Sequence, residues 1–170
     1  CTVPAFAPLI SVSAQVLVAA RYAATRVTGS TPDYVVVRNW PLARGRYFTD
    51  GEMRTAAKAC LLGETVRRTL FGRADPVGQT IRIGKVPCMV IGLLSEKGQG
   101  SFGQDYDDTV VMPLSTVRGR LRGSQGREVD QILVSVRDAS IMRRAQDQVT
   151  SLLRQRHRVA PGEENDFSVR

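Results

Sequence analysis

The chain has 170 residues, of which 42% are hydrophobic and 24% charged, and its formal net charge is +8. This composition is that of a globular chain, and the length fits one domain or two small ones that share a core. A mean hydropathy of −0.15 excludes an integral membrane bundle. One histidine and three cysteines leave too few ligands for a zinc site, and the chain has no CxxC, HExxH or GxxxxGKS motif. We therefore expect no catalytic residues, no bound cofactor and no metal, and hence not an enzyme.

The first 20 residues contain no charged side chain. Pro4 and Pro8 interrupt this stretch, and the near alternation of apolar and polar residues over 11–18 is typical of a half-buried strand rather than a membrane helix. A second strand is expected over 21–28. A cysteine at position 1 is also compatible with a lipid-anchored periplasmic binding module, which we keep as an alternative.

Short helices and strands follow in mixed order. Thr31 is the expected N-cap of a helix that begins at Pro32 and ends near Asn39. Thr49 and Glu52 have the spacing of a capping box. A helix is predicted over 64–71, closed by a glycine at position 72, and strands are predicted over 57–62, 79–83, 86–94 and 109–112.

The last quarter of the chain predicts a β-α-β unit. Its parts are a strand over 131–136, a helix over 139–157 and a final strand over 167–169. His157 ends that helix, where a protonated imidazole is favoured by the helix dipole. Short strands and helices without regular alternation indicate an α+β fold.

The glycine-rich loop over 95–108 contains two motifs that invite a binding function. Gly98, Gly100 and Gly103 match GxGxxG, but acidic residues follow and no helix begins there, so a mobile surface loop is favoured over a nucleotide site. Asp105 and the two aspartates after it do not have the ligand spacing of a calcium-binding loop. They are expected to form a solvated acidic tip.

Two further features leave alternatives open. The arginine-glycine run over 118–127 resembles an RNA-binding segment but has no interleaved aromatic residues, so a nucleic-acid-binding domain is the less favoured alternative. The same basic residues would also be attracted to anionic lipid head groups. Cys60 and Cys88 lie in apolar strands. They are either buried free thiols or, in an oxidising compartment, a bridged pair.

Several segments, taken in order over about residues 11–170, resemble the periplasmic core domain of MacB-type ABC transporter permeases. They lie at 27–34, 38–42, 45–48, 70–72, 75–83, 90–92, 98–108, 113–116 and 129–136. The resemblance implies a porter-like β-α-β subdomain formed by 1–30 and 127–170, with its N-terminal part truncated and an exposed edge strand there. Residues 31–126 would form an inserted mixed α/β subdomain.

The resemblance also implies a function. The chain would lie on the periplasmic face of the bacterial inner membrane and relay ATP-driven conformational change to an efflux assembly that exports antibiotics, peptides or envelope molecules. Its partners would be its own permease dimer mate, a cytoplasmic ABC ATPase, a periplasmic adaptor (membrane fusion) protein and an outer-membrane channel, with no nucleic acid. In the exposed loop over 97–108 the expected partner contacts are Lys97, Phe102, Gln104 and Tyr106.

Overall fold

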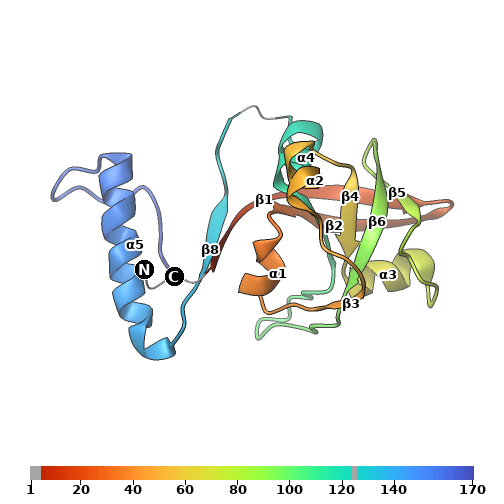
Figure 1. Cartoon of the computed structure of the whole chain (residues 1–170), viewed down its shortest axis with the longest axis horizontal. Coiled ribbons are helices and arrows are strands. Elements are labelled where there is room, and N and C mark those ends of the chain that lie inside the picture. Colours follow the sequence, from red (N-terminus) through yellow and green to blue (C-terminus); the bar gives the residue numbers. More distant parts are fainter. Residues whose placement is uncertain (1–4, 124–125) are drawn as a thin grey trace. The chain divides into compact units, whose positions relative to one another are not determined.

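The computed structural model in Figure 1 describes residues 5–123 and 126–170. The chain forms two compact units, one over Phe6–Leu133 and one that joins the amino-terminal end up to Ala5 with Val134–Arg170. The predicted subdomains 1–30 with 127–170 and 31–126 remain a prediction. Helices and strands are mixed without regular alternation, so the α+β fold class is confirmed.

Six strands close into a ring. In order around it they are β1 (Ala5–Val18), β2 (Arg21–Ser30), β7 (Thr109–Pro113), β4 (Ala59–Leu62), β6 (Val86–Leu94) and β5 (Thr80–Ile83). The ring closes because β1 pairs on both sides: Val16 lies opposite Ala23 of β2 and opposite Ile83 of β5. Two short strands lie outside the ring, β3 (Leu42–Gly45) on β6 and β8 (Gln131–Ser135) on β1.

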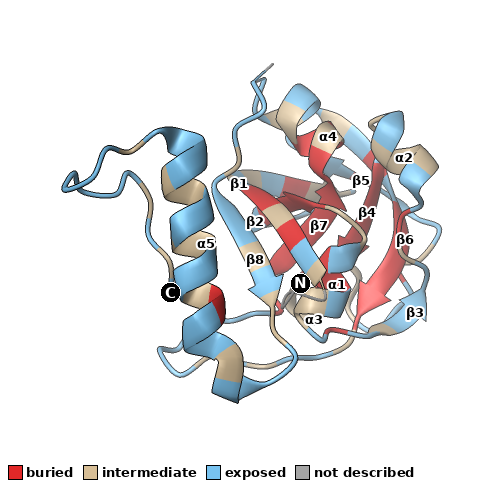
Figure 2. Cartoon of the chain, turned by 60° about the vertical axis from the view of Figure 1, so that its left-hand side comes forward, coloured by how far each residue is buried: buried red, intermediate tan, exposed pale blue. Residues whose placement is uncertain are grey.

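The main core fills this ring, since all six strands contribute buried side chains to one cluster (Figure 2). Its strand members are Ile10, Val16, Val27, Cys60, Leu62, Ile81, Ile83, Cys88, Val90, Leu93, Val110 and Met112. Alternate residues of β4, β6 and β7 point the other way, into a second cluster around Trp40 and Phe48. The central strands are therefore buried on both faces, which explains their continuous apolar sequence.

Short helices cover the ring, and most of their predicted ends are confirmed. They are α1 (Asp33–Val37), α2 (Asp50–Arg54), α3 (Glu64–Phe71) and α4 (Leu114–Thr116), the last continued by a π-helical turn over Val117–Leu121. Both hydrogen bonds of the predicted capping box of α2 are present. Helix α3 has the predicted bounds, and Gly72 closes it with a φ of +62°.

The predicted N-cap of α1 is wrong. Pro32 takes that position with helical angles, and no side chain caps the helix. The Thr31 carbonyl instead accepts the Tyr34 amide, so the turn closes through the backbone. The Thr31 hydroxyl is buried with no hydrogen-bond partner among the described residues.

The unit over 134–170 is built around α5 (Met142–His157), which follows a single 3₁₀ turn at Ala139–Ile141. The predicted final strand over 167–169 is wrong, because the chain after α5 folds back onto the end of that helix. Arg154 donates to two carbonyls of this tail, and the Phe167 ring lies edge-on to His157 with 5.5 Å between ring centroids. In the described part of the chain, the helices lack the combination of length and apolar character that crossing a bilayer requires.

Candidate partner-binding groove

A groove of about 890 Å³ lies over the outer face of β1 and β2, within the unit over 6–133. Its floor consists of alternate polar positions of the two strands, such as Ser13 and Arg26, which lie opposite each other in the ladder. Alternation along a strand places these side chains on the face opposite the core. The polar positions within the predicted strand over 11–18 are thus the sequence signal for this floor.

Two other segments form the walls. One is the stretch around α1, with Tyr34, Arg38 and Trp40, and the other is the loop between β6 and β7. From that loop come Lys97, Gln104, Asp105, Tyr106 and Asp108. The lining therefore mixes cations, carboxylates and aromatic rings, whereas small-molecule pockets are mostly apolar. Such a lining suits a polar segment of another protein.

Lys97 joins the two walls. Its ammonium donates to the Arg38 carbonyl at 2.9 Å, and it lies 5.0 Å from the Trp40 ring centroid and 6.0 Å from that of Tyr106. Partial burial lowers the pKa of Lys97, the nearby Arg38 charge lowers it further, and Asp107 opposes the change. Lys97 is an exposed residue, and cation–π attraction to the two rings favours this position of its ammonium.

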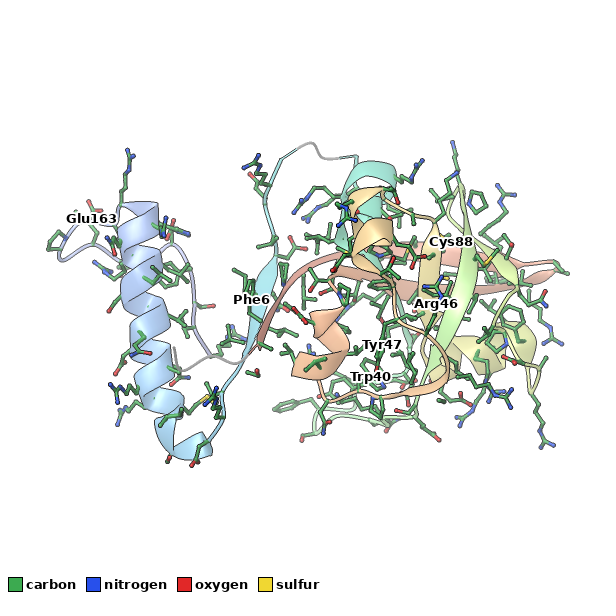
Figure 3. All side chains as sticks on the ribbon, in the orientation of Figure 1. Phe6, Trp40, Arg46, Tyr47, Cys88 and Glu163 are labelled. Carbon is green, nitrogen blue, oxygen red and sulfur yellow. The ribbon has the colours of Figure 1, made fainter. Side chains whose placement is uncertain are left out.

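Trp40 is fixed behind this contact. Its indole N–H donates to the Ser95 carbonyl at 2.7 Å, its carbonyl accepts from the Tyr47 hydroxyl, and its side chain is buried (Figure 3). Trp40 also lies in the second core cluster. Because it is separated from the loop by more than 50 residues, the sequence did not indicate that it supports Lys97.

The loop over 95–108 is ordered by its aspartates. Asp107 is only 3% exposed, and its carboxylate accepts the amides of Lys97 and Gly98 at 2.8 and 2.9 Å. Asp105 accepts the Asp107 amide and the Thr65 hydroxyl. The predicted solvated acidic tip is therefore wrong for Asp107, because a carboxylate that accepts two amides ties the ends of the loop together.

The four predicted contact residues separate into two groups. Lys97, Gln104 and Tyr106 line the groove together. Phe102 does not: it lies at the tip of the loop and is 91% exposed. The prediction that these residues contact a partner stays a prediction.

The sequence did not indicate Arg38 as a groove residue. Its guanidinium lies over the Tyr34 ring, 5.8 Å from the ring centroid, and its Nε is buried with no partner among the described residues. Burial raises the pKa of Tyr34, and the charge of Arg38 opposes that rise. Across residues 5–123 and 126–170, no cluster of three or more histidine, cysteine, aspartate or glutamate side chains is arranged to hold a metal ion.

A family profile of the MacB-like periplasmic core domain matches residues 3–152. The macrolide export ATP-binding/permease protein MacB of Syntrophobacter fumaroxidans is 32% identical over 98% of this chain and 30% of its own length. MacB of Rhodospirillum rubrum is 38% identical over 86% of this chain and 22% of its length. The pyoverdine export ATP-binding/permease protein PvdT of Pseudomonas aeruginosa is 36% identical over 78% of this chain and 20% of its own length.

Solved structures show the same fold. The periplasmic region of MacB from Actinobacillus actinomycetemcomitans has a TM-score of 0.76 at 23% identity, covering 92% of this chain and 68% of that one. The extracellular domain of the ABC-type transporter YknZ from Gram-positive bacteria has a TM-score of 0.77 at 18% identity, covering 94% of this chain and 79% of that one. The chain spans less than a third of the length of these curated relatives.

Proposed function

Since the chain belongs to the family of MacB-like periplasmic core domains, we propose that it is the part of an ABC-type export permease that lies outside the cytoplasmic membrane and transmits ATP-driven conformational change to a periplasmic adaptor. The observation that supports this most directly is the family match over residues 3–152. Relatives named as fused ATP-binding/permease proteins suggest that the energy comes from a cytoplasmic ATPase, fused or separate.

The names of the relatives suggest the class of cargo. MacB is named for macrolides and PvdT for the siderophore pyoverdine. We extend this to export of antibiotics, peptides or other envelope molecules.

The closed ring supports a relay in particular, because a barrel with a packed interior moves as one body when one of its strands is displaced. The relay works through a dimer mate, the adaptor and an outer-membrane channel.

For the contact with the adaptor we propose the loop over 97–108 and the groove beside it. The Asp107 hydrogen bonds hold the base of the loop, which lowers the ordering cost of presenting Phe102 at its tip. An exposed aromatic side chain on a fixed loop is a typical anchor in a protein–protein interface. Lys97 and Tyr106 supply polar contacts at its base.

The probe for that contact is a purified periplasmic adaptor protein from the same organism. Phe102→Ala is expected to weaken adaptor binding to the immobilised chain at least tenfold, a loss of about 1.4 kcal/mol or more. Tyr22→Ala is the matched control, because Tyr22 is also an exposed aromatic residue (66%) but lies on β2 rather than in the loop. Equal affinities for the wild-type and Phe102→Ala chains would exclude the loop as the docking element.

The gene itself tests the wider proposal. Reading the sequence on both sides of this segment is expected to show runs of about 20 apolar residues, the length that spans a bilayer. A lipoprotein signal that ends at Cys1, with a stop after Arg170, would instead favour the lipid-anchored binding module. Cys1 lies outside the described residues, so that alternative stays a prediction.

A further inference from the structure

The groove has more cations than carboxylates. Arg26 lies on its floor, Arg38 on the wall around α1 and Lys97 on the loop wall, whereas Asp105 and Asp108 are its carboxylates. Among residues 5–123 and 126–170, none of these three cations forms an ion pair with a carboxylate. Their positive charges are therefore open to an anionic ligand.

The two carboxylates of the groove are bound to other groups. Asp105 accepts the Thr65 hydroxyl at 2.6 Å and the Asp107 amide at 2.9 Å. Asp108 accepts the Thr25 hydroxyl at 2.7 Å. These hydrogen bonds anchor both carboxylates to the loop and to the strands beside it, and not to the cations.

Two neighbouring aromatic rings hold two of the cations. The Arg38 guanidinium lies 5.8 Å from the centroid of the Tyr34 ring, and the Lys97 ammonium lies 5.0 Å from that of Trp40. The two ring centroids are 6.4 Å apart, and the Lys97 ammonium also donates to the Arg38 carbonyl at 2.9 Å. The fold thus keeps two like charges near each other on a pair of ring faces.

The three positive charges act on the same small region. Burial lowers the pKa of Lys97, and the Arg38 charge lowers it further. Burial raises the pKa of Tyr34, and the charges of Arg38 and Arg26 oppose that rise. An anion bound among these residues would relieve the repulsion between their charges.

Arg38 also has a donor that the fold leaves unused. Its Nε is buried and has no hydrogen-bond partner among the described residues. The guanidinium is therefore not fixed by this donor and can turn on the face of the Tyr34 ring. A guanidinium binds a carboxylate through two parallel N–H donors, so an acidic ligand supplies the acceptor that is missing.

We propose that the groove is a binding site for an acidic segment of the adaptor, whose aspartate or glutamate carboxylates lie among Arg26, Arg38 and Lys97. Only the identity of this partner rests on the proposed function, because the preference for an acidic ligand follows from the groove itself. The volume of about 890 Å³ accommodates a peptide segment. A flat lipid surface would not reach Arg26, which lies on the floor between the two walls.

A fluorescently labelled hexaglutamate peptide is the first probe, and fluorescence polarisation with the full chain at low salt measures its affinity. Arg38→Gln and Arg26→Gln should each weaken binding at least roughly fivefold, because each removes a charge-assisted contact. The side chain of Arg26 lies on the strand floor and belongs to neither wall, so a displaced wall would not explain its effect.

Arg82→Gln is the matched control. Arg82 is an exposed arginine on β5 that lies outside the groove, and its replacement changes the net charge of the chain by the same amount. It should alter the affinity for hexaglutamate by less than about twofold. Equal affinities of wild type, Arg38→Gln and Arg26→Gln would overturn the proposal, as would a wild-type chain that does not bind hexaglutamate at millimolar concentration.

Two further probes define the ligand. Hexaglutamine should not bind, because it lacks the carboxylates, and inorganic phosphate should compete only at a concentration at least about tenfold above that of hexaglutamate, because one anion makes fewer contacts. Equal binding of hexaglutamine would overturn the proposal. So would competition by phosphate at the concentration of the peptide, because the groove would then be a site for a small anion.

The purified adaptor separates failure of this proposal from failure of the proposed function. Arg38→Gln should weaken adaptor binding at least roughly fivefold, and Arg82→Gln should not. A wild-type chain that binds hexaglutamate but not the adaptor would contradict the proposed function and leave the acidic preference of the groove standing. Unchanged adaptor affinity of Arg38→Gln, beside weakened peptide binding, would overturn the assignment of the groove to the adaptor and leave the export role standing.

Discussion

Gly63 shows how one missing side chain positions the loop of the groove. A Cβ built at Gly63 would lie 2.1 Å from the backbone oxygen of Asp107, far closer than any real contact. The Gly63 amide donates to Thr109, and the Thr65 amide donates to the same Asp107 oxygen. The end of the loop over 95–108 therefore packs directly on the backbone that leads from β4 into α3, and this needs a glycine at position 63.

Gly63→Ala is expected to destabilise the chain by about 3 kcal/mol, the upper end of the cost of overpacking, because the clash is with backbone and not with a movable side chain. Urea denaturation at equilibrium measures the difference. Gly119→Ala is the control: its new methyl group meets nothing within 4 Å, and in a helical turn alanine is favoured over glycine by about 0.5–1 kcal/mol. Similar stabilities for the two variants would contradict the close packing at position 63.

Among the elements, α2 is held mainly by its first turn. The Thr49 hydroxyl accepts the Glu52 amide, and the Glu52 carboxylate accepts the Thr49 amide. Arg46 donates to the same carboxylate at 2.7 Å, and this hydrogen bond is the main reason that the pKa of Glu52 lies below its ordinary value. A five-residue helix has little stability of its own, so these contacts fix where it lies.

The lowered pKa of Glu52 predicts a pH-dependent contribution. A carboxylate whose folded pKa is depressed stabilises the fold above its unfolded pKa, and the effect is lost as the pH falls through the folded value. Glu52→Gln should therefore be less stable than wild type by about 0.5–1 kcal/mol at pH 7. Thermal melts should show the difference shrinking below about pH 4.5.

Glu164→Gln serves as the control for this pH series, because Glu164 lies in the exposed tail after α5. It should match wild type at both ends of the range. A constant gap between Glu52→Gln and wild type from pH 7 to pH 3 would show that the charge of Glu52 contributes nothing.

Elements with local signals were predictable, and elements set by distant contacts were not. The capping box at Thr49 and the stop at Gly72 are encoded within a few residues, and both are confirmed. Phe167 and Val169 at the end of the chain suggest a short strand, but the course of the tail depends on Arg154 and His157, which bind it from the helix end. Such competition between a local preference and a side chain elsewhere leaves no pattern in the sequence.

At the scale of the whole molecule, the ring is self-sufficient. The strand and helix residues that build both core clusters lie between positions 7 and 133. The sequence indicated the strands one by one, but it did not indicate that β1 closes the sheet by pairing with β5. Three of the four predicted contact residues line the groove, which the sequence did not indicate, and Arg38 and Trp40 reach it only through the fold.

This predicts that a chain of residues 6–133 folds alone. Its far-UV circular dichroism should show a cooperative melt, and its amide NMR spectrum should overlay that of the full chain for residues of the ring. Removal of 6–20 from the same fragment is the control, because it deletes β1 and opens the ring between β2 and β5. A fragment over 6–133 without a cooperative transition would show that the ring depends on the rest of the chain.

The continuity of β1 has a mechanical consequence. The strand runs from Ala5 to Val18 without a glycine, and nine of its residues are paired in register with β2. A pull applied at Ala5 along the strand loads these ladder pairs in parallel, so that they must break together and not one after another. Strand β1 therefore behaves as a stiff rod from Ala5 to the β1–β2 turn. A displacement of one end is transmitted to the other end with little stretching of the strand.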